Sequence, residues 1–243
     1  MNLAWPSALL LLTAWAAQAD DADKLRALGG GVFTKGGAVA EISLNRSRIT
    51  DDQLKLVANF ANLTDLSLEQ TKIGDAGLAH LRGLAKLEWL NLYRTQVGDV
   101  GLAHLANLPR LQHLPIGETR VTDAGMAHIA KLKRLVYLGL RGNKIGDGAM
   151  AHLAKLPKLT GLHLGETRLT DKGTRQFVAL GQLQKLWLHD TRITDASVPR
   201  LAKLKQLKLV YLHRTRLTVD GVRRLQKALP KCRIFYRSAT VPE

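Results

Sequence analysis

Leucine residues recur at intervals of 24 along most of the chain. The first complete unit reads LTDLSLEQTKIGDAGLAHLRGLAK from Leu63, and equivalent leucines follow without an insertion as far as Leu207. Seven apolar offsets recur in each unit, and the first unit shows them at Leu63, Leu66, Leu68, Ile73, Leu78, Leu81 and Leu84. An eighth unit precedes, with Ile42, Leu44, Ile49, Leu54 and Val57 in frame. This pattern predicts a stacked array, in which each unit buries its apolar side against its neighbours.

The period of the apolar residues changes inside each unit. Leu66 and Leu68 alternate with polar neighbours, which indicates a short strand with one buried face, whereas Leu78, Leu81 and Leu84 have helical spacing. Asp75 precedes the helical part as a predicted N-cap, and Gly77 permits a tight turn into the helix. We therefore expect one strand and one helix per unit, with the strands about 4.8 Å apart in one parallel sheet.

The LxxLxLxxTxI pattern resembles the leucine-rich repeat family, with Thr where the family more usually has Asn; Asn143 alone keeps the Asn. The Thr variant and the GLAHL helix look like bacterial secreted leucine-rich repeat proteins and are similar to the repeats of F-box receptors and ribonuclease inhibitor. The resemblance covers about Ala38 to Tyr236. It implies an α/β fold, a right-handed β-α superhelix with a parallel sheet on the concave face and helices on the convex face. It implies little about the ligand, because such proteins bind diverse partners.

The amino terminus has the pattern of a processing signal. Residues 1–19 lack charged side chains, and Ala17-Gln18-Ala19 forms a small-x-small site before Asp20, which predicts a cleaved signal peptide and a secreted or periplasmic protein. An uncleaved membrane anchor is the alternative, although the apolar run is short for a span. The remaining predicted parts are a cap over 20–37 with a short helix, the repeat array over 38–230, and a capping strand and tail over 231–243. Cys232 is expected to be a structural thiol.

The strand positions between the buried leucines point to the opposite, concave face of the sheet. There they collect Trp and Tyr, which supply large contact areas at low entropic cost, and several His. We predict ten contact residues on this face: Trp89, Tyr93, His113, Tyr137, Arg141, His163, Trp187, His189, Tyr211 and His213. The alternative is that the aromatic residues only stabilise the sheet by packing across strands.

The predicted contact residues fall into two groups along the array. Trp187, His189, Tyr211 and His213 form a carboxyl-terminal cluster, and Trp89 with Tyr93 forms an amino-terminal one. Gly139, Gly161 and Gly165 are expected to leave the middle of the face flatter. A partner that contacts both ends would fit this arrangement.

Three further columns of polar residues recur along the units. His80, His104, His128 and His152 are expected on the solvent side of the helices, and without a carboxylate or thiolate beside them they predict no metal site. An acidic column is expected to cap helices: Asp51, Asp75, Asp99, Asp123, Asp147, Asp171 and Asp195. A basic column is expected to pair with it, or with Glu118, Glu166 and Asp190: Arg48, Lys72, Arg120, Lys144, Arg168, Arg192 and Arg216.

The formal net charge of +16 is concentrated outside the concave face. The helices and return loops hold the following cations, here called the basic helix side: Lys55, Arg82, Lys86, Arg110, Lys131, Lys133, Arg134, Lys155, Lys158, Lys172, Arg175, Arg200, Lys203, Lys205, Arg223, Arg224, Lys227 and Lys231. Only Asp52 and Asp220 oppose them there, whereas the concave columns are close to neutral. An anionic surface would therefore meet the back of the array.

Two functional hypotheses remain open from the sequence. The first is a secreted, monomeric, non-enzymatic module that binds a protein partner through its aromatic concave sheet. The alternative is a binder of anionic polysaccharide or of the cell envelope through the basic helix side. Nucleic acid is not expected as a partner of an exported protein, and no cofactor is predicted. Catalysis has little support, because the only acid–base neighbours on the sheet are His189 with Asp190 and His163 with Glu166, without a nucleophile motif.

Overall fold

Ten strands lie side by side in chain order in the computed structural model, which describes the backbone of residues 7–236 and the side chains of residues 17–236. All neighbouring pairs from β2 to β10 are parallel, while β1 and β2 form an antiparallel hairpin. The strands are β1 (Gly31–Lys35), β2 (Ala38–Ser43), β3 (Asp65–Ser67), β4 (Trp89–Asn91), β5 (His113–Pro115), β6 (Tyr137–Gly139), β7 (Gly161–His163), β8 (Lys185–Trp187), β9 (Leu209–Tyr211) and β10 (Arg233–Phe235).

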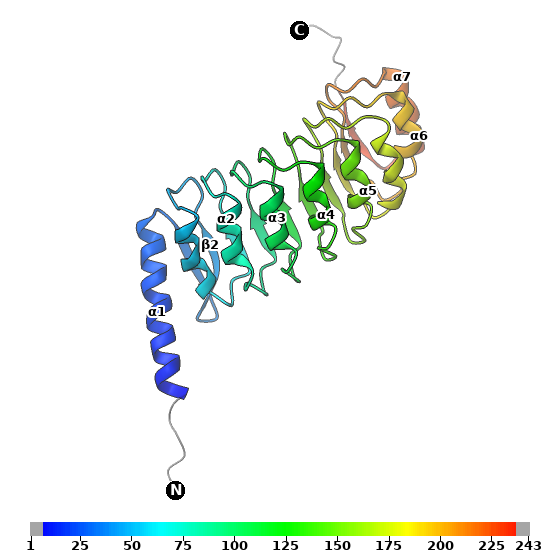
Figure 1. The fold of residues 1–243 in the computed structure, drawn as a ribbon. Helices are drawn as coiled ribbons and strands as arrows, with labels where there is room; N and C mark the ends of the chain where they lie inside the picture. Colours follow the sequence, from blue (N-terminus) through cyan, green and yellow to red (C-terminus); the bar gives the residue numbers. More distant parts are fainter. Residues whose placement is uncertain (1–6, 237–243) are drawn as a thin grey trace.

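The helices after α1 cover one side of the sheet, and α1 lies at the amino-terminal end of the array (Figure 1). The helical segments are α1 (Ser7–Ala27), η1 (Asp52–Asn59), α2 (Asp75–Leu78), η2 (Ala79–Leu81), α3 (Asp99–Leu105), η3 (Asp123–Gly125), α4 (Met126–Ile129), η4 (Asp147–Ala149), α5 (Met150–Leu153), η5 (Gly173–Ala179), η6 (Asp195–Ser197), α6 (Val198–Leu201) and α7 (Val219–Ala228), where η marks a 3₁₀ helix. The prediction of one strand and one helical segment per unit is confirmed, but several segments are partly or wholly 3₁₀. In η5, Thr174 stands at an apolar offset, and its hydroxyl donates to the carbonyl of Asp171 three residues earlier.

The predicted apolar offsets form one continuous core. All of them are buried except Val222 and Ala228, which are half-buried in the last unit. Leu66, Leu90 and their successors are in register from strand to strand, so that each leucine packs on its equivalent in the next unit. This confirms the predicted α/β architecture of stacked β-α units with a parallel sheet on one face and helices on the other; the β1–β2 hairpin is its antiparallel exception.

The acidic column does not cap its own helices, so that part of the prediction is wrong. Asp75 is the first residue of α2, and its N-cap neighbour Gly74 makes no side-chain cap bond. Each carboxylate instead accepts a hydrogen bond from a backbone N–H of the next unit: Asp51 from Gly74 (2.8 Å), Asp75 from Gly98 (2.6 Å), Asp99 from Thr122 (2.8 Å), Asp123 from Gly146 (2.7 Å), Asp147 from Thr170 (2.8 Å), Asp171 from Thr194 (2.9 Å) and Asp195 from Thr218 (2.8 Å). This Asp ladder therefore ties each unit to its successor, because the stacked units bring those N–H groups within reach.

The glycines of the helical segments make room for the Asp ladder. A Cβ atom on Gly101 would lie 2.5 Å from Asp75 Oδ1, and one on Gly221 would lie 2.1 Å from Asp195 Oδ1. Gly77 is likewise required for close approach, with Asp51 Oδ1 at 2.6 Å, rather than for the turn that the sequence predicted. At the same offset Ser197 replaces glycine, and its hydroxyl donates to Asp171.

The Thr positions that replace the usual Asn of the repeat satisfy a carbonyl within their own unit. The hydroxyl of Thr95 donates to Leu92 O at 2.8 Å, and that of Thr167 donates to Leu164 O at 2.7 Å. Asn143 instead reaches across to the preceding unit, where its amide donates to Ile116 O at 2.8 Å and its oxygen accepts from Thr119 N at 2.8 Å. The Thr variant therefore leaves the connection between units to the backbone and to the Asp ladder.

The two ends of the array are covered differently. The carboxyl-terminal turns of α1 pack on η1, with Leu25 fully buried and Asn59 donating to Asp21 Oδ2 at 2.6 Å. Helix α1 runs continuously through the predicted cleavage site after residue 19. At the other end, β10 pairs with β9, and the Tyr236 hydroxyl donates to Leu217 O at 2.8 Å. Residues 1–6 and 237–243 of the predicted signal and tail lie outside the described residues, and no helix in the described part is long and apolar enough to cross a membrane.

Candidate partner-binding face

The strand register places the predicted contact residues on one surface, here called the sheet face. All ten of them are half-buried. Trp89, His113 and Tyr137 are register partners on β4, β5 and β6, and His163, Trp187 and Tyr211 are register partners on β7, β8 and β9. The structure therefore brings six of the residues together as register partners on adjacent strands. The other four lie two residues beyond the ends of β4, β6, β8 and β9: Tyr93, Arg141, His189 and His213.

Four aromatic rings form a stacked row across the carboxyl-terminal strands. The ring centroids of His163 and Trp187 lie 5.3 Å apart, those of Trp187 and Tyr211 5.9 Å apart, and those of Tyr211 and Phe235 4.6 Å apart, with interplanar angles of 12°, 5° and 14°. Phe235 was not among the predicted contact residues. The 24-residue period could have found it, because it follows Tyr211 by one unit, but the last strand was considered only as a cap.

The stacking determines which parts of these rings a partner meets. Since the ring faces cover one another along the row, a partner would meet the rims of the rings and not their faces. The rim of an aromatic ring carries partial positive charge, and Trp187 and Tyr211 add N–H and O–H donors. The aromatic row therefore suits acceptor groups such as carbonyl and carboxylate oxygens better than it suits a flat group that would stack on an open ring face.

The expectation of a flat middle is wrong. Tyr137 lies over two glycines, since a Cβ atom on Gly161 would be 2.9 Å from its ring and one on Gly139 would be 3.1 Å from its hydroxyl oxygen. Tyr137 also meets the edge of Trp187, with centroids 6.2 Å apart. The ring of His189 covers Gly165 in the same way. The glycines therefore make room for large neighbouring side chains, and Tyr137 extends the aromatic surface from Trp187 to His113.

The margin of the sheet face, just beyond the strand ends, holds a left-handed backbone position in every unit. The non-glycine residues there with positive φ are Arg46, Gln70, Arg94, Glu118, Glu166, Asp190 and Arg214, with φ from 49° to 59°. Five of these side chains form ion pairs: Arg94 with Glu118 (2.6 Å), Glu166 with Arg141 (2.7 Å) and Arg214 with Asp190 (3.5 Å). The Tyr93 hydroxyl also donates to Glu118.

The predicted partners of the basic column are therefore wrong. Glu118, Glu166 and Asp190 pair with arginines of the sheet face and its margin, and across residues 17–236 no basic-column side chain takes part in an ion pair. Arg120 donates to Gln96 at 3.2 Å, and every member of the column is exposed. The carboxylates of the Asp ladder, which the sequence spacing suggested as partners of the basic column, instead accept hydrogen bonds from backbone N–H groups.

Several pKa values on the sheet face and its margin are displaced from their usual range. The Arg94 guanidinium lowers the pKa of Glu118, while burial and the bond to Glu118 raise the pKa of Tyr93. Burial, helped by the nearby His189 and Arg141, lowers the pKa of His163 to about 4. His163 is therefore a neutral ring at pH 7, which suits its stacked position against Trp187.

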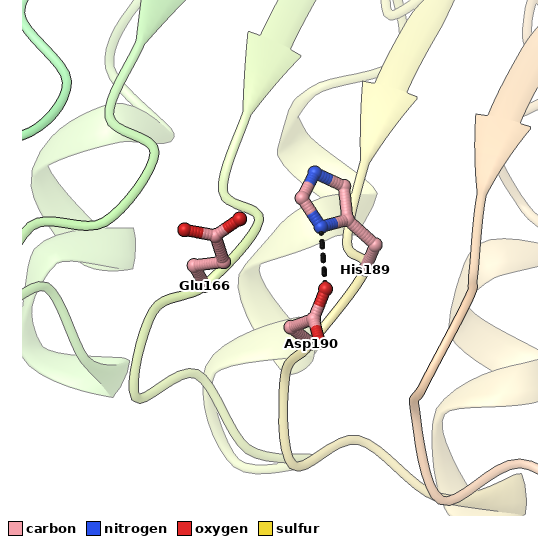
Figure 2. Close-up of side chains that lie close together, drawn as sticks. All are labelled: Glu166, His189 and Asp190. Carbon is pink, nitrogen blue, oxygen red and sulfur yellow. Dashed lines mark hydrogen bonds and ion pairs between the residues drawn. The ribbon is translucent and has the colours of Figure 1, made fainter. Parts of the chain in front are cut away.

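Glu166, His189 and Asp190 form a mixed cluster at the edge of the aromatic row (Figure 2). One ligand atom from each lies within 4.8 Å of the others, and His189 Nδ1 is 2.9 Å from Asp190 Oδ2. Such nitrogen and oxygen donors suit Zn²⁺. However, Arg141 and Arg214 already balance the two carboxylates, so the cluster lacks the excess negative charge that would attract a cation. We assign no metal to it.

The surface hollows fit a binding surface better than an enclosed active site. A hollow of about 490 Å³ is lined by the Glu166–His189–Asp190 cluster together with Trp187, Tyr211, His213 and Arg214. A larger one of about 710 Å³ lies apart from the aromatic row, against Arg46, Arg48 and Lys72 near the first Asp of the ladder. In that hollow, Asp51 is already bonded to Gly74 N, and no aromatic side chain contributes to the lining.

The histidine column on the helices is half-buried, and not fully solvent-exposed as the sequence analysis expected. Adjacent units approach closely enough for Arg82 Nε to donate to His104 Nδ1 at 3.0 Å. Burial, with the Arg82 charge, lowers the pKa of His104. The column therefore contributes contacts between units.

Comparison with known proteins addresses the fold. Internalin C2 from Listeria monocytogenes superposes with a TM-score of 0.68 at 24% identity, over 90% of this chain and 84% of that chain. The LRR ectodomains of the Arabidopsis receptor kinases GASSHO1/SCHENGEN3 and HAESA superpose with TM-scores of 0.58 and 0.65, at 16% and 18% identity, over 86% of this chain. This chain has the leucine-rich repeat fold.

The leucine-rich repeat array of this protein is much shorter than those two plant ectodomains, of which it covers 26% and 36%. A scan of protein-family models found no match, and neither did a search of curated proteins. At these identities the similarity shows only that the leucine-rich repeat fold is shared. It does not identify contact residues on this chain.

Proposed function

We propose that this protein is a secreted or periplasmic, non-enzymatic leucine-rich repeat module that binds a protein partner through its sheet face. The observation that carries the proposal is the aromatic row of His163, Trp187, Tyr211 and Phe235, four stacked and half-buried rings on one surface. Interface hot spots are enriched in Trp, Tyr and Arg at the centre of a contact. The sheet face offers all three, since Arg141 lies beside the row.

Two of the structural neighbours support a polypeptide ligand by analogy. The GASSHO1/SCHENGEN3 ectodomain was solved in complex with CASPARIAN STRIP INTEGRITY FACTOR 2, and the HAESA ectodomain with a peptide hormone. Secretion rests on the predicted signal segment over residues 1–19. The non-enzymatic role rests on the charge-balanced Glu166–His189–Asp190 cluster and on the open, shallow surface around it.

The test is affinity capture from the native cell envelope with the wild-type protein and with the double variant Trp187→Ala/Tyr211→Ala. We expect the variant to lose the captured partner, because it removes the two central rings of the row. Circular dichroism melting must show that the array remains folded. Val178→Ala is the matched control, since Val178 is 60% exposed on η5 and lies on the helix side of the array. A partner held with unchanged affinity by the double variant contradicts the proposal.

A second candidate function is the binding of an anionic polysaccharide or an envelope surface by the basic helix side. All of its cations are exposed except the half-buried Arg200, and only Arg223 and Arg224 among them form ion pairs in the described part of the chain. Lys131, Lys133 and Lys155 lie close together on adjacent units, with the Lys133 ammonium 3.1 Å from Lys155 O. Such unpaired charge favours a polyanion.

Heparin chromatography tests the second candidate. We expect retention that depends steeply on salt and that falls in the triple variant Lys131→Ala/Lys133→Ala/Lys155→Ala, because bound cations release counterions from the polymer. The Trp187→Ala/Tyr211→Ala variant is the control and should elute with the wild type. Elution of the wild type at the low salt of a neutral protein excludes this function.

A further inference from the structure

Charges that lack an ion-pair partner are segregated along the sheet face. The register column that starts on β2 runs across the strands as Glu41, Asp65, Trp89, His113, Tyr137, Gly161, Lys185, Leu209 and Arg233. The column is therefore acidic at its amino-terminal end, aromatic in the middle and basic at its carboxyl-terminal end. It belongs to the same surface as the aromatic row.

The acidic end is not neutralised by the protein. Glu41 is exposed, and Asp65, its register partner, is half-buried and accepts a hydrogen bond from the Thr64 hydroxyl at 2.6 Å. Neither carboxylate forms an ion pair within residues 17–236. Glu69 and Glu88 add negative charge on the neighbouring columns.

Two cations lie near the acidic end: Lys35 on β1, opposite Ala38, and Arg46 just beyond the end of β2. The Arg46 guanidinium donates to the Gln70 side chain at 2.9 Å in the margin, beyond the carboxyl ends of the strands, whereas Glu41 lies within β2. Neither cation belongs to the column, and therefore neither reverses the sign of the charge along the column itself.

The basic end is equally free of opposing charge. Lys185 on β8 and Arg233 on β10 are both exposed, and Lys208 before β9 adds a third exposed cation. None of the three forms an ion pair in the part of the chain that the structure describes, and the Arg233 guanidinium instead lies 5.4 Å from the centre of the Phe235 ring. Cations at this end therefore remain available to an acidic ligand.

The other charges of this surface do not cancel the change from an acidic end to a basic end along the column. Glu118, Glu166 and Asp190 are balanced in the margin by arginines at 2.6–3.5 Å. Between the two ends, the stacked rings of His113 and Tyr137 are 6.5 Å apart and supply an apolar surface with polar tips. An extended ligand that lies along the column would meet fields of opposite sign at its two ends.

We propose that the sheet face binds an extended polypeptide segment that crosses the strands in one direction, with its basic end over Glu41 and Asp65 and its acidic end over Lys185 and Arg233. This inference rests on the proposed protein-binding function and adds the chemistry and the orientation of the ligand. A polypeptide fits because its carbonyl groups match the donor rims of the aromatic row. The five to eight strand spacings between the charged ends correspond to about 24–38 Å, or roughly seven to twelve extended residues.

Two synthetic peptides test the proposal. Both have twelve residues and the same composition, with lysines, glutamates, phenylalanines and serines. One has its lysines at the amino end and its glutamates at the carboxyl end, and in the other the charges alternate. We expect fluorescence anisotropy to show about tenfold tighter binding of the segregated peptide, since several surface ion pairs of modest strength form together. A benzophenone at its amino end should crosslink to β2 or β3.

Charge exchange on the protein gives the decisive variants. Glu41→Lys/Asp65→Lys should abolish the preference for the segregated peptide. Adding Lys185→Glu/Arg233→Glu should restore it and move the benzophenone crosslink to β8 or β10. Lys131→Glu/Lys155→Glu on the basic helix side is the matched control and should change neither affinity nor crosslink. Thermal melting monitors folding of each variant.

Three outcomes overturn the inference: equal affinity for the two peptides, crosslinks at both ends of the array, or binding of neither peptide. The proposed function is judged separately by capture with Trp187→Ala/Tyr211→Ala. A captured partner that depends on those rings but not on the charge exchange would keep the protein-binding function and reject the orientation.

Discussion

The Asp ladder and the aromatic row both follow the 24-residue period, but they use their side chains in opposite ways. In the ladder the same residue type recurs, and each carboxylate is occupied by a backbone N–H of the next unit. In the row the residue type changes from His163 to Trp187 to Tyr211, and the rings stack on one another. Positions with a strict repeat thus hold the array together, whereas positions that vary on a fixed frame are available for recognition.

The contrast between the Asp ladder and the aromatic row predicts that substitution of a ladder residue causes the largest loss of stability. Asp171 accepts hydrogen bonds from Thr194 N at 2.9 Å and Thr194 Oγ1 at 2.7 Å, and also from the buried Ser197 hydroxyl. Asp171→Ala should lower the free energy of unfolding by about 2–3 kcal/mol, because these donors lose their acceptor. Chemical denaturation measures the change, with the exposed Asp220→Ala as control at less than about 0.5 kcal/mol. Equal losses at both positions would break the comparison.

We also expect the contribution of the Asp171 carboxyl to stability to depend on pH in the acidic range. Burial alone would raise its pKa, but the hydrogen bonds from Ser197 and Thr194 outweigh burial and lower it. Because the folded pKa is below the unfolded one, the stabilisation is present above the usual pKa of a carboxyl and is lost as pH falls through the lowered value. Asp171→Asn should therefore flatten the decline in melting temperature at acidic pH.

A glycine that makes room for the ladder should be the next most sensitive position. In Gly101→Ala the new Cβ would lie 2.5 Å from Asp75 Oδ1 and 3.1 Å from Asp75 Cα, so the neighbouring unit must move. We expect a loss of about 1–2 kcal/mol in the free energy of unfolding. Gly83→Ala is the matched control, since no atom lies within 4 Å of its added Cβ. A stable Gly101→Ala protein would mean that the ladder is adaptable.

The smallest predicted effect on stability comes from the protonation of His163 in the aromatic row. The pKa of His163 is lowered to about 4, so between that value and its usual 6.5 the unfolded chain binds more protons than the folded one. Stability should therefore fall as pH drops through this window. The contribution is on the order of 1 kcal/mol, because His163 is only half-buried. Urea unfolding from pH 7 to 4 measures it.

His163→Gln should make that pH profile flatter, and His80→Gln on the helices controls for the loss of one histidine. If the two variants have the same profile, the row does not isolate His163 from water. That result would weaken the distinction between the rims of the rings and their covered faces.

Much of the candidate site could be predicted from alternation alone. The faces of the strands follow from a period of two, so Trp187 and Tyr211 could be placed on one surface without coordinates. The role of Gly139, Gly161 and Gly165 could not be predicted, because the sequence does not show which neighbouring side chain lies over a glycine. The ion-pair partners were also misjudged: sequence spacing brings Arg120 close to the acidic residues, but Glu118 pairs with Arg94 one unit away.

The sequence by itself determined the number of units, the buried leucines and the surface on which the aromatic residues lie, because these depend only on period and polarity. Only the tertiary structure decided what each polar side chain contacts. Stacking the units turned the Asp column from expected caps into links between units, and it placed Tyr137 against Trp187 where a flat middle was expected. The reason is physical: periodicity sets the direction in which a side chain points, whereas its partner depends on which atoms the neighbouring unit brings within hydrogen-bonding or stacking distance.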